Sequence, residues 1–189
     1  MKIFFLGDIV GKSGRAAVAK NLKKIIKDNK IDFVVVNGEN AADQGVGITE
    51  EISNELFNLG VDAITTGNHV WDQKETASYI EKESRLLRPK NLASNSPGKG
   101  FGIYKSKNGY KVGVLNLMGN VFMKKCDDVF ESAKLFLGKY KLREDYDFLI
   151  VDFHGEITSE KMAMGFFFDG KQLCWWAHIH MCQQMIVEF

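Results

Sequence analysis

Apolar and polar residues in the first part of the chain follow two different periods, which predicts strands separated by helices. The apolar run MKIFFLGD (1–8) has the length of a short strand, and residues 15–29 place apolar side chains at helical spacing between lysines. DFVVVNGEN (32–40) is the next predicted strand, 49–60 is a helix with a threonine N-cap, and VDAITTGNHVWD (61–72) is the third strand. This alternation indicates a parallel α/β layout.

The second half of the chain continues the pattern less regularly. Residues 84–109 are rich in Gly, Ser, Asn and Lys and contain both prolines, which predicts loop with short strands. KVGVLNLMG (111–119) and DFLIVDFHGE (147–156) are apolar strands, with a helix expected over 128–142. FFFDGKQLCWW (166–176) is expected to form a hairpin, because its Asp-Gly pair suits a two-residue turn.

Composition narrows the class of protein. A chain of 189 residues with 45% hydrophobic content can bury roughly 70% of its unfolded surface, so one domain over 1–189 is expected. The 25 basic and 24 acidic residues leave a net charge of +1, which predicts no extended nucleic-acid surface and no attraction to anionic membranes. The cysteines are odd in number and form no CxxC pair, and no window reaches the roughly 18 apolar residues of a membrane span. We therefore expect a soluble cytoplasmic protein.

The segment FFLGDIVGKSGR (4–15) raises the alternative of a phosphate-binding loop. A Walker loop needs four residues between its first glycine and its Gly-Lys pair, whereas Gly7 and Gly11 enclose only three. One of those three is Asp8, a carboxylate at the place where a phosphate would lie. A P-loop protein would depend on Lys12 for nucleotide binding, whereas the spacing favours Asp8 as the functional residue.

Four predicted strands end in polar groups that can bind metal ions. Each signal is weak alone, since a strand-end Asp or Asn is commonly a turn former. The carboxyl ends of parallel strands meet at one edge of a sheet, however, so the groups are expected to gather in one crevice. A set of carboxylate, amide and imidazole without thiolate suits Fe, Mn or Zn. The groups are Asp8, then Glu39 with Asn40, then Asn68 with His69, and finally His154 with Glu156.

A series of motifs runs in order along residues 1 to about 174. They are GDIVGKSGR, NGENAA, GVGIT, LGVDAITTGNHVWD, LLRP, PGKGFGIY, NLMGNVFM and DFHGEITSEKMAMGFFFDG. Together these motifs resemble the YmdB-type branch of the bacterial calcineurin-like metallophosphoesterases. The resemblance implies a four-layer αββα sandwich, a dimetal site at the strand ends, and 2',3'-cyclic-nucleotide phosphodiesterase activity.

The resemblance also implies a role for each metal-competent residue. Asp8 would be a ligand of the first metal and Glu39 the carboxylate that bridges both, with Asn40 beside them. Asn68 and His154 would be ligands of the second metal. The cofactors would be two divalent or trivalent ions, Fe, Mn or Zn.

The implied reaction is hydrolysis of a cyclic nucleotide or a related phosphodiester. A hydroxide held between two cations is a nucleophile at neutral pH, and the cations stabilise the charge that develops on the phosphoryl oxygens. His69 would then protonate the leaving ribose oxygen, because histidine is partly protonated near neutral pH. The alternative is a non-catalytic remnant of the family without metal-dependent activity.

The tail from 175 to 189 departs from the family pattern. Where the family has a stretch like VVGTHTHVPTAD, this chain has CWWAHIHMCQQMIVEF, and the codons of Trp and Met allow VGTHTHVPT in the neighbouring frame. The expectation is a frameshifted or split reading frame after Cys174, with the C-terminal region lost. His178 and His180 keep a His-x-His spacing one residue out of register, which sends strand side chains to the opposite face and makes them doubtful ligands. We expect weak or absent metal-dependent activity from this chain alone, and aggregation or self-association through exposed apolar sheet edges.

Overall fold

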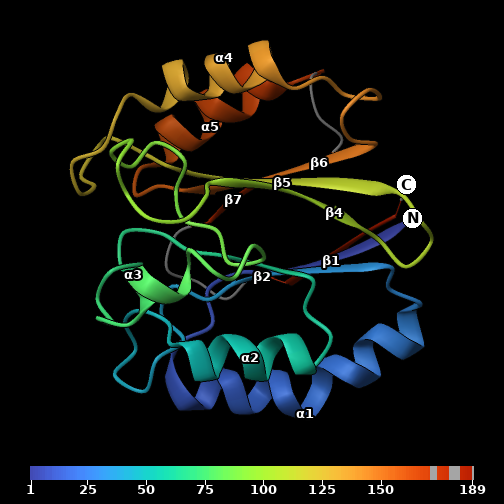
Figure 1. Ribbon diagram of the computed structural model, residues 1–189. Coiled ribbons are helices and arrows are strands. Elements are labelled where there is room, and N and C mark those ends of the chain that lie inside the picture. Colours follow the sequence, from blue (N-terminus) through green and yellow to red (C-terminus); the bar gives the residue numbers. More distant parts are fainter. Residues whose placement is uncertain (171–173, 179–183, 189) are drawn as a thin grey trace.

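The chain forms two four-stranded sheets that lie face to face, with helices on the outer face of each (Figure 1). The structure is a computed structural model that describes residues 1–170, 174–178 and 184–188, with side chains described for 1–170 and 186–188. From one side of the molecule to the other, the layers are helices, sheet, sheet and helices.

The first sheet has the strand order β3-β2-β1-β8. β1 (Lys2–Leu6), β2 (Phe33–Asn37) and β3 (Ala63–Thr65) are parallel, as the sequence predicts. β8 (Gln184–Glu188) runs antiparallel to β1 and forms the other edge. Every residue of β2 is buried, because both faces of this central strand are covered.

Two helices cover the outer face of this sheet (Figure 1). α1 (Gly11–Asn29) begins four residues earlier than predicted, so that the Gly-Lys-Ser segment of the alternative phosphate loop forms its first turn. α2 (Glu50–Asn58) begins as predicted: Oγ1 of Thr49 accepts a hydrogen bond from the Ile52 amide at 3.2 Å, and two glutamates lie in the first turn.

The second sheet has the order β4-β5-β6-β7. β5 (Lys111–Met118), β6 (Phe148–His154) and β7 (Cys174–His178) are parallel, and β4 (Phe101–Lys105) is antiparallel to β5. α4 (Val129–Lys139) lies on its outer face, where the sequence predicts a helix.

The predicted hairpin at 166–176 is wrong. Residues 158–168 form a helix, α5 (Thr158–Phe168), which lies beside α4 on the second sheet (Figure 1). Glu160, Met164 and Phe168 are buried at four-residue intervals, the spacing of one helix face, so packing of this face outweighs the turn propensity of the following Asp-Gly pair. A short helix, α3 (Thr76–Tyr79), was not predicted.

The apolar core between the two sheets holds them together. Side chains of both sheets form one buried cluster, which unites the inner faces of β1, β2 and β3 with those of β5 and β6. Burying one such side chain contributes about 1.5–3 kcal/mol. The cluster comprises Ile3, Phe5, Phe33, Val35, Ala63, Leu87, Val112, Val114 and Ile150.

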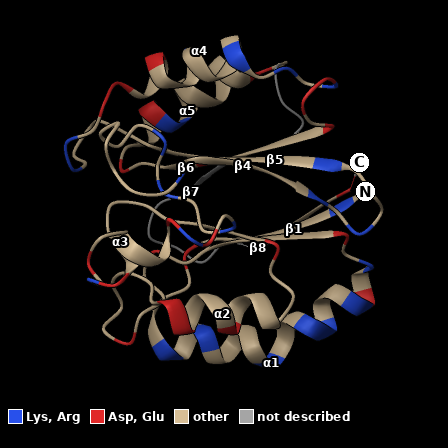
Figure 2. Ribbon diagram, viewed as in Figure 1, with Lys and Arg blue, Asp and Glu red and all other residues tan. Residues whose placement is uncertain are grey.

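Charged residues of both signs are interspersed on the outer helices α1 and α2 (Figure 2), in keeping with the net charge of +1. Among the described residues, no helix combines the length and the apolar character that crossing a lipid bilayer requires.

The packing between the sheets can be tested at Ile150. We expect Ile150→Ala to lower the free energy of unfolding by about 2–5 kcal/mol, because it leaves a cavity between the sheets. The control is Ile103→Ala on β4, where the side chain is 41% exposed and the expected loss is about 1 kcal/mol or less. Urea denaturation measures both, and equal losses would contradict the packed interface.

Candidate metal centre

The predicted site residues lie at the carboxyl ends of strands from both sheets. Asp8 follows β1, Glu39 and Asn40 follow β2, Asn68 follows β3, and His154 is the last residue of β6. In Figure 1 the loops after these strands lie at the end of the molecule opposite the N-terminus. The parallel strands thus carry groups distant in sequence to one edge.

Hydrogen bonds connect these five residues. Nδ2 of Asn40 donates to both carboxylate oxygens of Asp8, at 2.9 and 3.0 Å, and lies 3.4 Å from Oε1 of Glu39. The same Oε1 lies 3.2 Å from Nε2 of His154, and Nε2 lies 2.7 Å from Oδ1 of Asn68. Glu39 therefore stands at the centre of the network, between one sheet and the other.

The network is almost closed to water. Asp8, Glu39, Asn40 and His154 are all buried. Among the described residues, the network brings the carboxylates of Asp8 and Glu39 together with the imidazole of His154. Burial without a compensating positive charge is costly for carboxylates.

Further buried polar groups lie next to this network and are hydrogen-bonded to it or to one another. Oδ1 of Asn37 accepts a hydrogen bond from the Glu39 amide at 3.2 Å, and Nδ2 of Asn37 donates to Oδ2 of Asp152 at 3.1 Å. The Thr66 amide donates to Oδ1 of Asn116 at 3.0 Å. Both side-chain links cross from the first sheet to the second. Our sequence analysis missed them, although a polar residue inside an apolar strand was a signal at Asn37, Asn116 and Asp152.

Gly67 gives the two sheets room to meet at the site. A Cβ on this glycine would overlap a carboxylate oxygen of Glu39 and stand 2.6 Å from Cδ2 of the His154 ring. Contacts this short do not occur in folded proteins, so a larger residue would push the Glu39 carboxylate and the His154 imidazole apart. The absence of a side chain is thus part of the geometry.

His69 follows Asn68 directly and lies beside the network. Its Nδ1 is 2.6 Å from Oδ2 of Asp72, and the Lys124 ammonium donates to the Asn68 carbonyl at 2.8 Å and lies 3.4 Å from Oδ1 of Asp72. Burial raises the pKa of the Asp72 carboxyl, but the His69 hydrogen bond and the Lys124 charge outweigh it and hold that pKa below its ordinary value. An ionised Asp72 fixes the imidazole through Nδ1.

Comparison with known proteins places this arrangement in a family. A family model described as YmdB-like protein matches residues 4–182. The chain belongs to the YmdB-like family. It is 43% identical over 171 residues to a Bacillus subtilis protein named 2',3'-cyclic-nucleotide 2'-phosphodiesterase, covering 90% of this chain and 63% of that protein. The chain spans about 60% of the length of the curated relatives it matches.

Two solved structures share the fold of this YmdB-like chain. A hypothetical protein from Thermus thermophilus superimposes with a TM-score of 0.85 at 34% identity, covering 94% of this chain and 67% of that one. A structure described as a novel phosphatase from Mycoplasma pneumoniae gives 0.81 at 35% identity, with 91% and 61% covered.

The donor chemistry of the YmdB-like site fits oxygen- and imidazole-ligated cations. Carboxylate, amide and imidazole groups converge there, and most of them are buried. The side chains are arranged around hydrogen bonds: Asn40 turns Nδ2 toward both acids, so a cation would need its amide rotated to present oxygen. Within the described part of the chain, no three His, Cys, Asp or Glu side chains are grouped to hold an ion.

Two predictions fall in the C-terminal tail. His180 lies outside the described residues, and the side chain of His178, at the end of β7, is not described either. Their assignment as doubtful ligands therefore stays a prediction.

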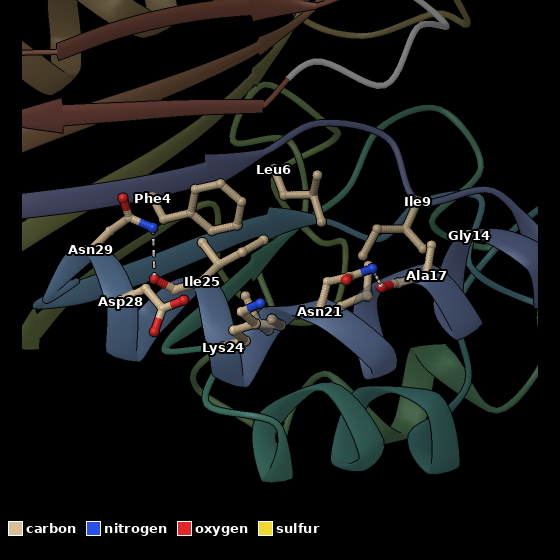
Figure 3. Close-up of a pocket in the computed structure, with 12 residues that line it drawn as sticks. Phe4, Leu6, Ile9, Gly14, Ala17, Asn21, Lys24, Ile25, Asp28 and Asn29 are labelled. Carbon is tan, nitrogen blue, oxygen red and sulfur yellow. Dashed lines mark hydrogen bonds between the residues drawn. The ribbon is translucent and has the colours of Figure 1, made fainter.

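An apolar hollow is separate from this site. It lies between α1 and β1 and has a volume of about 410 Å³, with Phe4, Leu6 and Ile25 in its wall (Figure 3). None of the five network residues lines it. Figure 3 shows the polar side chains of Asn21 and Asn29 bonded to backbone carbonyls of their own helix, which leaves a mainly hydrophobic surface.

The role of Gly67 can be tested against another glycine. We expect Gly67→Ala to lower the free energy of unfolding by about 1–3 kcal/mol, because the new methyl group displaces Glu39 and His154. The control is Gly138→Ala in α4, where a Cβ meets nothing within 4 Å and the expected change is a gain of about 0.5–1 kcal/mol. Chemical denaturation measures the free energy of unfolding of both variants. An unchanged free energy of unfolding for Gly67→Ala would disprove the steric overlap with Glu39 and His154.

Proposed function

We propose that this chain is the metal-binding part of a phosphodiesterase that hydrolyses 2',3'-cyclic nucleotides or related phosphodiesters. The observation that carries the proposal is the contact of Glu39 with His154, since it joins an acid of one sheet to an imidazole of the other at the strand ends. The name of the Bacillus subtilis relative supports the substrate class. The two facing sheets with helices outside them support the proposal of a calcineurin-like metallophosphoesterase.

Asp8, Glu39, Asn40, Asn68 and His154 are the proposed ligands of two Fe, Mn or Zn ions. Such cations, when bound, would supply Lewis-acid stabilisation of the charge that develops on the phosphoryl oxygens. Asn37 fixes the backbone amide of Glu39, so the central carboxylate is held in place before any ion binds.

His69 is the proposed general acid. Asp72 holds its Nδ1, so that Nε2 is the nitrogen that donates a proton to the leaving ribose oxygen. Lys124, in the loop after β5, contacts the Asn68 carbonyl and the Asp72 carboxylate. These contacts hold the segment that carries His69, and so its imidazole, beside the metal centre. Asp72 and Lys124 are positioning residues in this scheme.

Two other interpretations of the chain's function compete with this proposal. A non-catalytic remnant of the family would bind no catalytic metal and hydrolyse nothing. A P-loop protein would need the Lys12 ammonium to bind the phosphates of a nucleotide. Lys12 lies instead in the first turn of α1, where its Nζ is 3.1 Å from Oδ2 of Asp43.

The role of His69 separates catalysis from metal binding. We expect His69→Ala to lower the rate of 2',3'-cAMP hydrolysis with added Mn²⁺ by about 10²–10⁴-fold while metal content stays unchanged, because proton donation alone is lost. Asp8→Asn is the control that loses metal as well. Elemental analysis measures the metal content, and a phosphodiesterase assay measures the hydrolysis rate. If His69→Ala lost as much metal as Asp8→Asn, His69 would be a ligand. If the unaltered chain hydrolysed nothing, the non-catalytic remnant would be favoured.

Phe122 is the proposed contact for the nucleobase. Its side chain is 84% exposed, and its φ of +60° is a backbone conformation that bulky residues rarely adopt. Its loop is anchored to the site, since the Gly119 amide donates to the His154 carbonyl at 2.8 Å and Lys124 contacts the His69 segment. Phe122 lies at most about 7 Å along the chain from Lys124.

Base recognition can be measured by comparing two substrates. We expect Phe122→Ala to raise the KM for 2',3'-cAMP about 5- to 150-fold, because a base–aromatic stack contributes about 1–3 kcal/mol. The KM for a base-free cyclic phosphate diester should not change. Phe166→Ala, which removes a 75% exposed ring near the far end of α5, is the matched control. Equal effects on both substrates would refute base stacking.

A further inference from the structure

A second hollow carries a concentration of positive charge. It lies on the outer side of the second sheet, between the segment before β4 and the second half of α4, with a volume of about 350 Å³. Four of its lining side chains are cations: Arg88, Lys90, Lys99 and Lys139. In the part of the chain that the structure describes, no Asp or Glu lines it. The chain as a whole is nearly neutral, so this local excess of one sign is unusual.

Arg88 supplies a fixed charge at the base of the hollow. It is buried, and its guanidinium donates to four backbone carbonyls, those of Pro89, Lys90, Ser96 and Pro97, at 2.8 to 3.3 Å. Carbonyl dipoles satisfy its hydrogen bonds but do not neutralise its charge. Arg88 thus shapes the loop and projects a positive field toward the opening.

The charge of Arg88 acts on the Lys90 ammonium. Burial, followed by the charges of Arg88 and Lys139, lowers the pKa of the Lys90 ammonium. The charges that act on Lys90 are therefore of its own sign. Like charges gathered around a partly enclosed space destabilise the empty hollow, and an anion in that space would relieve them.

The rest of the lining favours an anion that carries an organic part. Phe101 and Tyr140 contribute aromatic surface, with ring centroids 4.7 Å apart, and Leu135 adds an exposed aliphatic side chain. A volume near 350 Å³ lies at the lower end of ligand sites, larger than a bare inorganic ion needs. Lysine ammonium groups bind phosphate as mobile point charges.

We propose that this hollow is a binding site for a small phosphomonoester, such as a sugar phosphate or a nucleoside monophosphate. Lys90, Lys99 and Lys139 would contact the phosphate dianion, and the aromatic surface would contact the organic part. The site is distinct from the metal centre: Asp8, Glu39 and His154 do not line it. It stands independently of the proposed catalytic function.

Calorimetric titration of the full chain in EDTA tests the site without catalytic metals. Ribose 5-phosphate, AMP and inorganic phosphate are the probes. We expect the two phosphomonoesters to bind and Lys90→Gln and Lys139→Gln each to weaken binding about tenfold, because each removes a charge-assisted hydrogen bond. Comparison of the two phosphomonoesters shows whether the organic part is a sugar alone or also a base.

Lys134→Gln is the matched control, because Lys134 also lies on α4 but pairs with Glu131 and faces a different hollow. It should leave binding unchanged, and thermal unfolding checks that every variant is folded. The proposal is overturned by three results: no binding at millimolar concentrations, inorganic phosphate binding as tightly as the esters, or binding lost in His69→Ala and retained in both lysine variants.

Discussion

The hydrogen bond between Asn37 and Asp152 is the constraint on which the site depends. It joins β2 of one sheet to β6 of the other at 3.1 Å, in a position with no access to water. Apolar packing holds the sheets together but tolerates sliding, because dispersion contacts have little directional preference. A buried polar pair has a strong directional preference and a high cost if it is broken. It therefore fixes the register in which Glu39 and His154 meet.

This constraint explains why the site is built from both sheets. Asn37 accepts from the Glu39 amide, and Asp152 lies two residues before His154 on the same face of β6. A shift of one sheet against the other would move the imidazole away from the central carboxylate. Gly67 completes the arrangement by leaving the space into which both groups point. The acid and the imidazole are thus placed by their neighbours before a ligand arrives.

Apart from the short helix α3, the order of strands and helices up to residue 154 could be predicted, because hydrophobic period and capping residues are local signals. The gathering of Asp8, Glu39, Asn40, Asn68 and His154 followed from their positions at parallel strand ends. The segment 166–168 was misassigned because a strong local turn signal follows it, whereas the helix is stabilised by burial against the second sheet. The Asn37–Asp152 pair spans 115 positions, and only the folded chain shows that these two polar residues are partners.

The two sites proposed for this chain, the metal centre around Glu39 and the hollow around Lys90, would bind anions in opposite ways. The network around Glu39 brings two carboxylates together, and in the proposed phosphodiesterase metal cations would offset the repulsion between these acids and an anionic phosphodiester. The hollow around Lys90 is positive and attracts an anion without any cofactor. With a net charge of +1, the chain has little long-range field, and salt screens exposed charges beyond about 10 Å. In both proposals the ligand would therefore be selected through local charge, and opposite local charges allow one small domain to hold two such sites.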